Sequence, residues 1–331
     1  ATMSRFSDRV STKGSSLSSR AEPLTTAMSP ALPGRNRRRP NWLPYLLALP
    51  ILLYEGIFIL YPIYQGVRSS FFRQQIGMPE EWAGLANYQR MLSDPSFWGV
   101  MGTTIGYMLA VIALAIGVGL GSALILNRAF RGRTLARALM TMPWSFPDVP
   151  TVLVFIWILN PSFGVANVFA RLLPWIEENP TWLLDPRLAF LSVVGITAWK
   201  GFPFYSLVIL AALQTVPAEL TEAARIDGAT HRQAFFAVTL PTISPTLMLL
   251  TVLAAIFSFK QFTLIWLLTG GGPSGATETI VIRIYSTAFR FYDFSYAAAL
   301  GVAGFLLTLT VSLVFDPHAS PDGAHSDALE A

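Results

Sequence analysis

The sequence lacks cysteine, is poor in charged residues and has three histidines, and each shortage excludes a kind of chemistry. Without cysteine the chain forms no disulfide and holds no thiol nucleophile, and its redox compartment stays open. His231, His318 and His325 lie outside the long apolar runs. No H-E-x-x-H, Walker A or dinucleotide-binding pattern accompanies them. An enzyme acting inside the membrane therefore has no motif to support it, and we expect no catalytic residue and no metal site.

Long apolar runs dominate the chain instead. Charged residues amount to 13% of the 331 residues, against about 25% in an average soluble domain. Hydrophobic residues amount to 53%, and the mean hydropathy is +0.51. A membrane-spanning helix needs about 20 mostly apolar residues. Segments of that kind are 43–67, 98–126, 135–159, 189–213, 243–268 and 294–315. These runs are too long for the strands of a barrel. The sequence predicts an all-α integral membrane protein with six transmembrane helices.

The distribution of basic residues predicts which side of the membrane each linker occupies. They gather before the first run, between the second and third, and between the fourth and fifth: Arg35, Arg37, Arg38, Arg39, Arg128, Arg131, Arg133, Arg137, Arg225, His231 and Arg232. The positive-inside rule makes this side the cytoplasm, so both termini are expected inside a bacterial or archaeal plasma membrane. Linkers 68–97, 160–188 and 269–293 are then external. The net charge of +4 follows from this pattern, and no nucleic-acid partner is expected.

The composition divides the chain into three parts. Residues 1–40 are rich in serine, proline and arginine and lack an apolar run, which predicts a disordered basic cytoplasmic tail. Residues 41–315 hold the six runs. The first run is too long for the apolar region of a signal peptide, so an uncleaved first helix is expected. Residues 316–331 form a polar tail.

Four ionisable residues lie within the expected spans: Glu55, Asp148, Lys200 and Lys260. A charge at the bilayer centre costs at least ~2.5 kcal/mol on insertion scales, so such residues usually face a cavity or a partner. Two acids and two bases also permit internal pairing, which is a structural role. By helical rise, Lys200 is expected roughly 16 Å and Lys260 roughly 12 Å below the external ends of their spans. Snorkelling of Lys260 along its own stem is the alternative.

Asp148 lies in a segment with prolines on either side. Pro143, Pro147 and Pro150 are expected to break the third span. Irregular backbone at membrane depth is tolerated only where it is buried in protein or lines a cavity. Aromatic residues gather near these charges and suit the apolar faces of sugar rings, although ordinary packing explains most of them.

A polar loop between the fourth and fifth runs is the most informative segment of the chain. Pro217 suits the start of a short helix at about 217–231. Glu222 lies in its early turns, where the helix dipole favours negative charge. Ala223 and Ala224 give this helix a small face that another protein can approach closely. Gly228 can adopt the left-handed conformation that ends a helix.

Residues 222–241 of this loop resemble the EAA signature of permease subunits in binding-protein-dependent ABC importers. Glu222-Ala223-Ala224 is followed at the signature spacing by Gly228 and by Leu240-Pro241, with Val238 where isoleucine is usual. The segments 199–204 and 268–279 resemble the carbohydrate-uptake branch, which includes maltose and glycerol-phosphate permeases. The resemblance covers about residues 42–315. It implies the type I importer fold, with a helix that couples to a separate ATPase through Glu222, Ala223, Ala224, Asp227 and Gly228.

The resemblance also implies partners and substrate contacts. The partners are a second homologous permease, two ATP-binding subunits, an extracytoplasmic substrate-binding protein, a sugar-type substrate and the lipid bilayer. This chain would bind no cofactor, because ATP and Mg would be used by the ATPase subunits. The residues carried over as substrate contacts, with their neighbours, are Trp144, Asp148, Thr197, Trp199, Lys200, Gly201, Phe204, Ser258, Lys260 and Gln261. The sequence departs from the maltose subunit at Asp148, where a neutral polar residue is expected, and at Lys260-Gln261, where two amides are expected.

The function expected from the resemblance is a non-catalytic sugar permease that works by alternating access. A secondary transporter that couples ions through Glu55, Asp148, Lys200 and Lys260 is the alternative, but it has no use for an ATPase-docking helix. The charge of the substrate stays open at this point. An anionic sugar would suit Lys200 or Lys260, whereas a neutral one would suit pairing of both lysines with Asp148 and Glu55.

Overall fold

The computed structural model describes residues 42–74, 79–174 and 176–314. The expected tails, 1–40 and 316–331, therefore lie outside the described residues. Contacts divide the chain into two units, and the boundary lies between Leu53 and Tyr54. The second unit, which begins at Tyr54, holds the packed helices.

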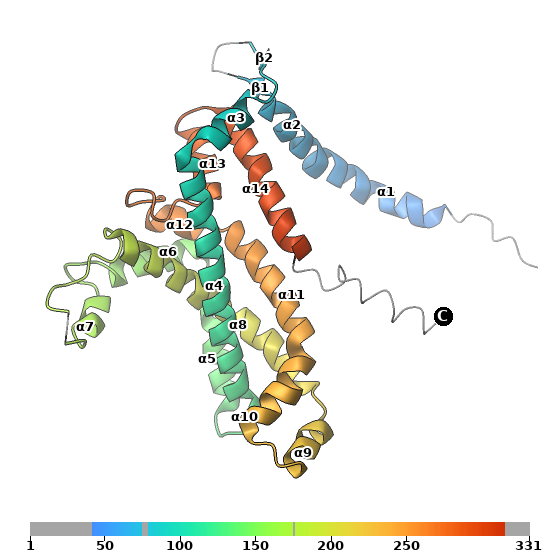
Figure 1. The fold of residues 1–331 in the computed structure, drawn as a ribbon, viewed down its shortest axis with the longest axis vertical. Helices are drawn as coiled ribbons and strands as arrows, with labels where there is room; N and C mark the ends of the chain where they lie inside the picture. The colour runs from blue at the N-terminus through green and yellow to red at the C-terminus, as the bar shows by residue number, and fades with distance from the viewer. Residues whose placement is uncertain (1–41, 75–78, 175, 315–331) are drawn as a thin grey trace, which may run out of the picture. The chain divides into compact units, whose positions relative to one another are not determined.

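The described residues form helices and one small hairpin (Figure 1). The elements are α1 (Leu43–Glu55), the π-helix η1 (Gly56–Leu60), α2 (Tyr61–Ser70), β1 (Phe72–Arg73), β2 (Glu81–Trp82), α3 (Ala86–Ser93), α4 (Pro95–Asn127), α5 (Arg133–Ser145), α6 (Asp148–Ile158), α7 (Ala166–Ala170), α8 (Pro186–Gln214), α9 (Ala218–Ile226), α10 (His231–Ala234), the π-helix η2 (Phe235–Thr239), α11 (Leu240–Phe259), α12 (Thr263–Leu268), α13 (Ile280–Phe289) and α14 (Phe294–Val314). The strands pair antiparallel, with Phe72 opposite Trp82.

Five helical segments of the described chain are long and apolar enough to cross a membrane. They are Pro44–Ser70, Pro95–Asn127, Pro186–Gln214, His231–Phe259 and Phe294–Val311. A sixth span arises if α5 and α6 are counted together, although they are bent by 97°. The all-helical membrane fold expected from the sequence is thus confirmed at the level of five to six spans.

The bend between α5 and α6 is the predicted break of the third span. Phe146 precedes Pro147, and a residue before proline is pushed out of the helical region. Both residues are extended, with ψ of 137° and 151°. Asp148 then begins α6.

The fifth span differs from the expected range 243–268. The helix begins at His231 and passes through Pro241, because the π-helix η2 precedes this proline. Leu240 N–H bonds back to the carbonyl of Phe235, and the wider turn accommodates the missing N–H of the next residue. The same arrangement, η1, precedes Pro62. At its other end the helix stops at Phe259, so Lys260 lies after it, and the expected depth of Lys260 within an unbroken span is wrong.

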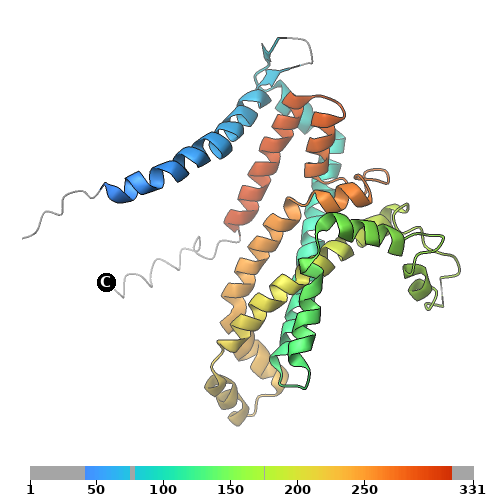
Figure 2. The same ribbon diagram turned by 180° about the vertical axis from the view of Figure 1, so that it is seen from behind.

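The core of the second unit is the contact between α4 and α8 (Figure 1). Small residues allow the two helices to approach closely. A Cβ on Gly119 would lie 3.1 Å from Cβ of Tyr205 and 3.2 Å from the backbone nitrogen of Ser206. Ala115 and Ile209 are fully buried in the same cluster. Helix α11 contacts α4, α8 and α14 (Figure 2).

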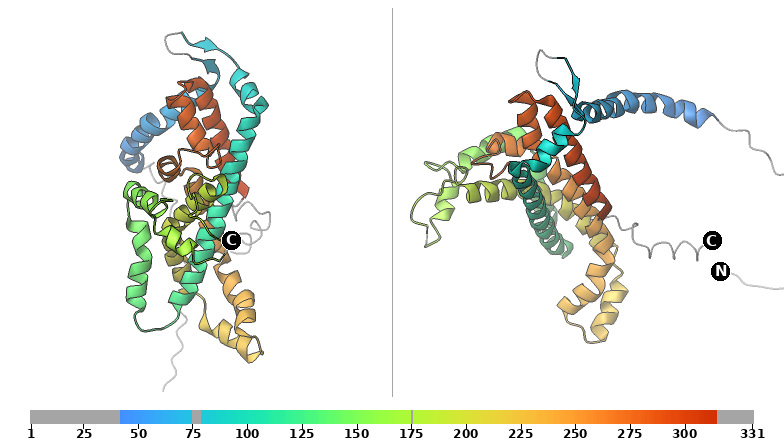
Figure 3. Two further views of the ribbon diagram at one scale, coloured as in Figure 1. Left: turned by 90° about the vertical axis from the view of Figure 1, so that its left-hand side faces the viewer. Right: turned by 45° about the horizontal axis from the view of Figure 1, so that its top comes forward.

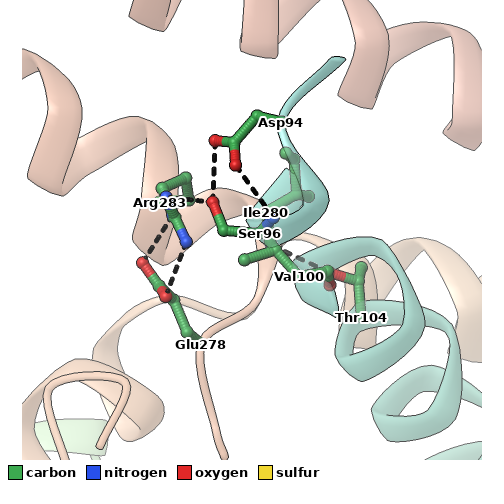
Figure 4. Close-up of polar contacts among 7 residues, drawn as sticks. All are labelled: Asp94, Ser96, Val100, Thr104, Glu278, Ile280 and Arg283. Carbon is green, nitrogen blue, oxygen red and sulfur yellow. Dashed lines mark hydrogen bonds and ion pairs between the residues drawn. The ribbon is translucent and has the colours of Figure 1, made fainter. Parts of the chain in front are cut away.

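A second group of contacts lies at the N-terminal end of α4. Helix α14 packs against α13, α2 and α3 there (Figure 3). Thr104 Oγ1 accepts a buried hydrogen bond of 2.8 Å from the backbone N–H of Ile280, and this bond joins α4 to the first residue of α13 (Figure 4). The loop before α13 is thereby held against α4.

An ionic network surrounds that joint (Figure 4). Arg283 Nε lies 2.8 Å from Oε1 of Glu278, and Arg283 Nη1 donates to Ser96 Oγ at 3.3 Å. Ser96 in turn donates its hydroxyl and its backbone N–H to Asp94, which caps α4. These two bonds, the hydroxyl first, lower the pKa of Asp94. Its carboxylate is therefore ionised at neutral pH, and the cap is intact.

Candidate functional site

A cavity of about 360 Å³ lies among α4, α5, α8 and α11. Its lining includes eight of the ten residues carried over as substrate contacts, namely Trp144, Thr197, Lys200, Gly201, Phe204, Ser258, Lys260 and Gln261. These residues come from segments far apart in the sequence. Tertiary packing brings them together, which makes this cavity the candidate substrate site.

One face of helix α8 lines the cavity. Thr197, Lys200, Gly201 and Phe204 occupy positions i, i+3, i+4 and i+7 of the helix, which fall on the same face. Trp199 does not line the cavity. It is two positions from Thr197, a rotation of about 200° around a helix with 3.6 residues per turn. Its ring instead meets the ring of Phe155 on α6 edge-on at 5.2 Å.

Aromatic rings form one wall of the cavity. The rings of Trp144 and Phe204 are 6.0 Å apart at 30° to one another, and those of Phe204 and Phe257 are 6.3 Å apart and close to perpendicular. Trp144 is in the last turn of α5, immediately before the break, and Phe257 is in the last turn of α11. The apolar C–H face of a sugar ring fits such a wall, and edge-on contacts with Tyr205 and Phe257 hold the ring of Phe204 in place.

Polar groups lie beside this wall. Thr197 Oγ1 accepts a hydrogen bond of 2.9 Å from the buried hydroxyl of Tyr107 on α4. The Thr197 hydroxyl hydrogen is thus left for another acceptor. Ser258 donates to the carbonyl of Ala254 at 2.7 Å, so its oxygen can still accept. Gln261 adds an amide. Together these groups can donate to and accept from hydroxyls.

Lys200 is paired within the chain. Its Nζ lies 3.1 Å from Oδ1 of Asp148 and donates to the carbonyl of Phe146. Phe146 caps the C-terminus of α5, where carbonyls lack intrahelical partners, and Asp148 begins α6, where the dipole favours a carboxylate. One lysine of α8 thereby satisfies both sides of the break. Asp148 itself is not among the lining residues.

Lys260 is in a different situation. It caps the C-terminus of α11, and its Nζ lies over the ring of Phe257, 5.0 Å from the centroid. It forms no ion pair with any residue that the structure describes. Glu55 pairs with neither of the two lysines. Internal pairing, which the sequence left open for both lysines, holds for Lys200 alone.

Sequence reasoning missed part of the lining. Val111 and Ala115 of α4, Tyr205 of α8, Ala254 of α11 and Leu264 of α12 also line the cavity. Apolar residues in a spanning helix carry no local sign of which way they face. Tyr107 behind the cavity is different, because a buried hydroxyl in an apolar helix needs a partner and is a usable signal.

The candidate coupling helix is α9, at the opposite end of α4 from α3 (Figure 1). It begins after Pro217, which is extended and occupies the N-cap position. Gly228 has φ of +88°, the left-handed conformation expected of it. Ala229 N–H bonds to the carbonyl of Ala224, and Gly228 N–H bonds to that of Arg225. This pair of bonds is a Schellman motif.

The surface of α9 is mostly exposed, with Thr221 and Ala224 half-exposed. No residue of this helix is buried, and Ile226 is 87% exposed. Glu222, Ala223 and Asp227 are exposed as well. Directly after the Schellman motif, a capping box between Thr230 and Gln233 begins α10. The exposed helix is thus joined by a short, hydrogen-bonded link to the helix that runs from His231 to Phe259.

Long apolar helices, a polar and aromatic cavity between them and an exposed short helix at one end define a membrane-transport subunit. Residues 113–317 match the family described as binding-protein-dependent transport system inner membrane component. The chain belongs to this family. Membership of this family does not favour the alternative interpretation of the chain as a secondary transporter.

Three curated relatives are similar over most of the chain. The trehalose/maltose transport system permease protein MalF of Thermococcus litoralis is 35% identical over 82% of this chain and 92% of its own. The sulfoquinovosyl glycerol transport system permease protein SmoG of Agrobacterium fabrum is 34% identical over 82% and 89%. The sn-glycerol-3-phosphate permease protein UgpA of the same species is 31% identical over 82% and 92%.

The fold also matches a solved structure. A bacterial ABC transporter involved in the import of the acidic polysaccharide alginate aligns with a TM-score of 0.70. The alignment covers 84% of this chain and 95% of that chain at 24% identity. At this level the likeness concerns the fold alone.

Proposed function

We propose that this chain is the membrane permease subunit of an ATP-driven ABC importer for a sugar or sugar derivative. Its curated relatives are named for the transport of trehalose and maltose, sulfoquinovosyl glycerol and sn-glycerol 3-phosphate. The observation that carries the proposal is the cavity, whose wall of Trp144, Phe204 and Phe257 lies beside the polar groups of Thr197, Ser258 and Gln261.

Transport by this chain requires partners. A second permease of the same kind, two ATP-binding subunits and an extracytoplasmic binding protein complete the proposed importer. The permease hydrolyses nothing itself. Both termini are cytoplasmic in this proposal, and the complex lies in the plasma membrane, as the basic residues between the spans indicate.

Coupling to ATP hydrolysis runs through α9. Its exposed face, with Ala223 and Ile226, offers apolar contact to an ATPase subunit, and Glu222 and Asp227 add charge. The Schellman motif and the capping box connect α9 tightly to the His231–Phe259 helix. That helix carries Phe257 and Ser258 at the cavity. A displacement of α9 is therefore passed along one continuous helix to the substrate site, which opens alternately to each side.

Within the cavity we assign the wall to the sugar ring and the polar groups to its hydroxyls. Trp144 and Phe204 offer the ring face, while Thr197, Ser258 and Gln261 bind hydroxyls. Gly201 lies between these groups on the same face of α8 and lines the cavity without a side chain. Trp199 and Asp148, which do not line the cavity, act by holding α6 and Lys200.

Uptake in proteoliposomes tests this function. The four membrane-associated subunits are reconstituted with the binding protein, and uptake of a panel of neutral and anionic sugars is measured with and without ATP. Trp144→Ala and Phe204→Ala are expected to lower uptake by about tenfold or more, since each lost contact of ~1.4 kcal/mol is a factor of ten. Trp157→Ala, an exposed tryptophan of α6 outside this cavity, is the matched control. ATP-independent uptake, or equal effects of all three variants, would refute the proposal.

A further inference from the structure

The lining of the cavity carries positive charges and no negative ones. The charged residues that line it are Lys200 and Lys260, and no aspartate or glutamate lies among the lining residues. Low-dielectric walls focus the field of such charges into the space between them. The charge that a substrate meets there depends on which lysine is neutralised by the protein.

Lys200 is neutralised. The carboxylate of Asp148 lies 3.1 Å from its Nζ, and the carbonyl of Phe146 accepts another of its protons. Its side chain is 16% exposed, so little of its charge is left to water. Both partners, Phe146 and Asp148, lie at the break between α5 and α6. These contacts within the chain account for the position of the Lys200 side chain, and no substrate is needed to explain it.

No acidic residue that the structure describes neutralises Lys260. It has no acidic partner among the described residues, and its one recognisable contact is the face of Phe257 at 5.0 Å. A ring quadrupole attracts an ammonium but cancels none of its net charge. Its position after the end of α11 places it beside Ser258 and Gln261, the polar groups of the cavity. A net positive charge therefore remains at the substrate site.

We propose that the substrate is an anionic sugar derivative, carrying a phosphate, sulfonate or carboxylate, and that Lys260 Nζ binds this anionic group. The proposal rests on the proposed transport function and narrows its substrate class. The ring of the sugar lies against Trp144 and Phe204, and the anion lies toward Lys260, with Gln261 donating beside it. The names of the curated relatives cover neutral and anionic substrates, so the family by itself does not decide between them.

The test compares anionic with neutral probes. Proteoliposomes holding the complete importer are given sn-glycerol 3-phosphate, sulfoquinovosyl glycerol and a glucuronide, or trehalose and maltose, and uptake and stimulated ATPase activity are measured. We expect an anionic probe to be transported and Lys260→Met to lower its uptake about tenfold or more, the size of one charge-assisted hydrogen bond. Lys260→Arg, which keeps the positive charge, is expected to retain most of the uptake of the anionic probe.

A matched control is available at Arg290, which within the described part of the chain also lies over a ring and forms no ion pair. Arg290 lies over Trp266 at 4.6 Å and does not line the cavity, so Arg290→Met removes an equivalent charge outside the site. It is expected to leave uptake close to that of the unaltered importer. Equal losses in both variants would overturn the proposal, since the effect would then belong to net charge and not to the site.

Two other outcomes overturn it. Transport of trehalose or maltose alone, unchanged by Lys260→Met, would leave the transport function standing and exclude an anionic substrate. Loss of the second permease from purified Lys260→Met complexes would show that an acidic residue of that subunit neutralises Lys260. If neither anionic nor neutral probes are transported with ATP, the proposed transport function fails together with the proposed substrate class. Failure of the substrate class alone is therefore distinguishable from failure of the transport function.

Discussion

Lys200 Nζ of α8 lies 3.1 Å from the carboxylate of Asp148, the first residue of α6. This pair ties the broken span to α8, which contributes more of the cavity lining than any other helix. Because Asp148 is 34% exposed, its charge is partly solvated, and the pair is weaker than a fully buried one.

The pair predicts a specific pattern of compensation. Asp148→Asn and Lys200→Met are each expected to lower the melting temperature of the purified complex, because each leaves one charge unpaired near the membrane interior. The double variant is expected to recover part of the loss, with a coupling of about 1 kcal/mol. Thermal melts of the four proteins measure this. Additive losses would mean that the two residues act independently, and then Asp148 has a role other than pairing.

Gly228 is expected to be necessary for coupling. With φ of +88° it is left-handed, and a valine there costs about 1–2 kcal/mol. No heavy atom lies within 4 Å of an added Cβ, so backbone strain alone causes the effect. Gly228→Val should uncouple transport, measured as uptake and substrate-stimulated ATPase activity, while the subunit still inserts. Gly132→Val is the control, since Gly132 has φ of +86° and open space but lies in another loop. Full activity of Gly228→Val would contradict the coupling path.

The orientation of the chain can be measured by labelling, because it has no native cysteine. A cysteine at Arg131 or Arg232 is expected to be protected from an impermeant thiol reagent added outside, and one at Glu177 is expected to react. Permeabilised cells, in which all three sites should react, supply the control. Labelling of the Arg131 site in intact cells would reverse the proposed topology.

Gly119 is expected to be critical for stability. A Cβ at this position would lie 3.1 Å from Tyr205 Cβ and 3.2 Å from the Ser206 backbone, so α4 and α8 would have to separate. Gly119→Ala should destabilise the purified subunit by about 1–3 kcal/mol, measured by thermal unfolding in detergent. Gly121→Ala, on the same helix with no atom within 4 Å, should be neutral or slightly stabilising. Equal melting temperatures for the two variants would exclude close packing at Gly119.

Local signals in the sequence were sufficient to predict several features of the structure. The break at Phe146-Pro147 follows from the steric effect of a proline on the residue before it. The stop of α9 at Gly228 follows from the freedom of glycine at positive φ. Both effects involve only neighbouring residues. The extent of the fifth span was not predictable in the same way, because the π-helix before Pro241 depends on how the helix is packed.

The sequence by itself determined that long apolar spans are present, where the turn at Gly228 lies, and which polar residues are available inside the membrane, because run length and turn chemistry are local properties. Only the tertiary structure decided which of these residues meet. Lys200 pairs with Asp148 while Lys260 has no acidic partner among the described residues, and Trp199 faces α6 instead of the cavity. The reason is that a helix presents a new face about every 100°, and the face turned to a neighbour is set by packing, here the contact of α4 with α8 at Gly119.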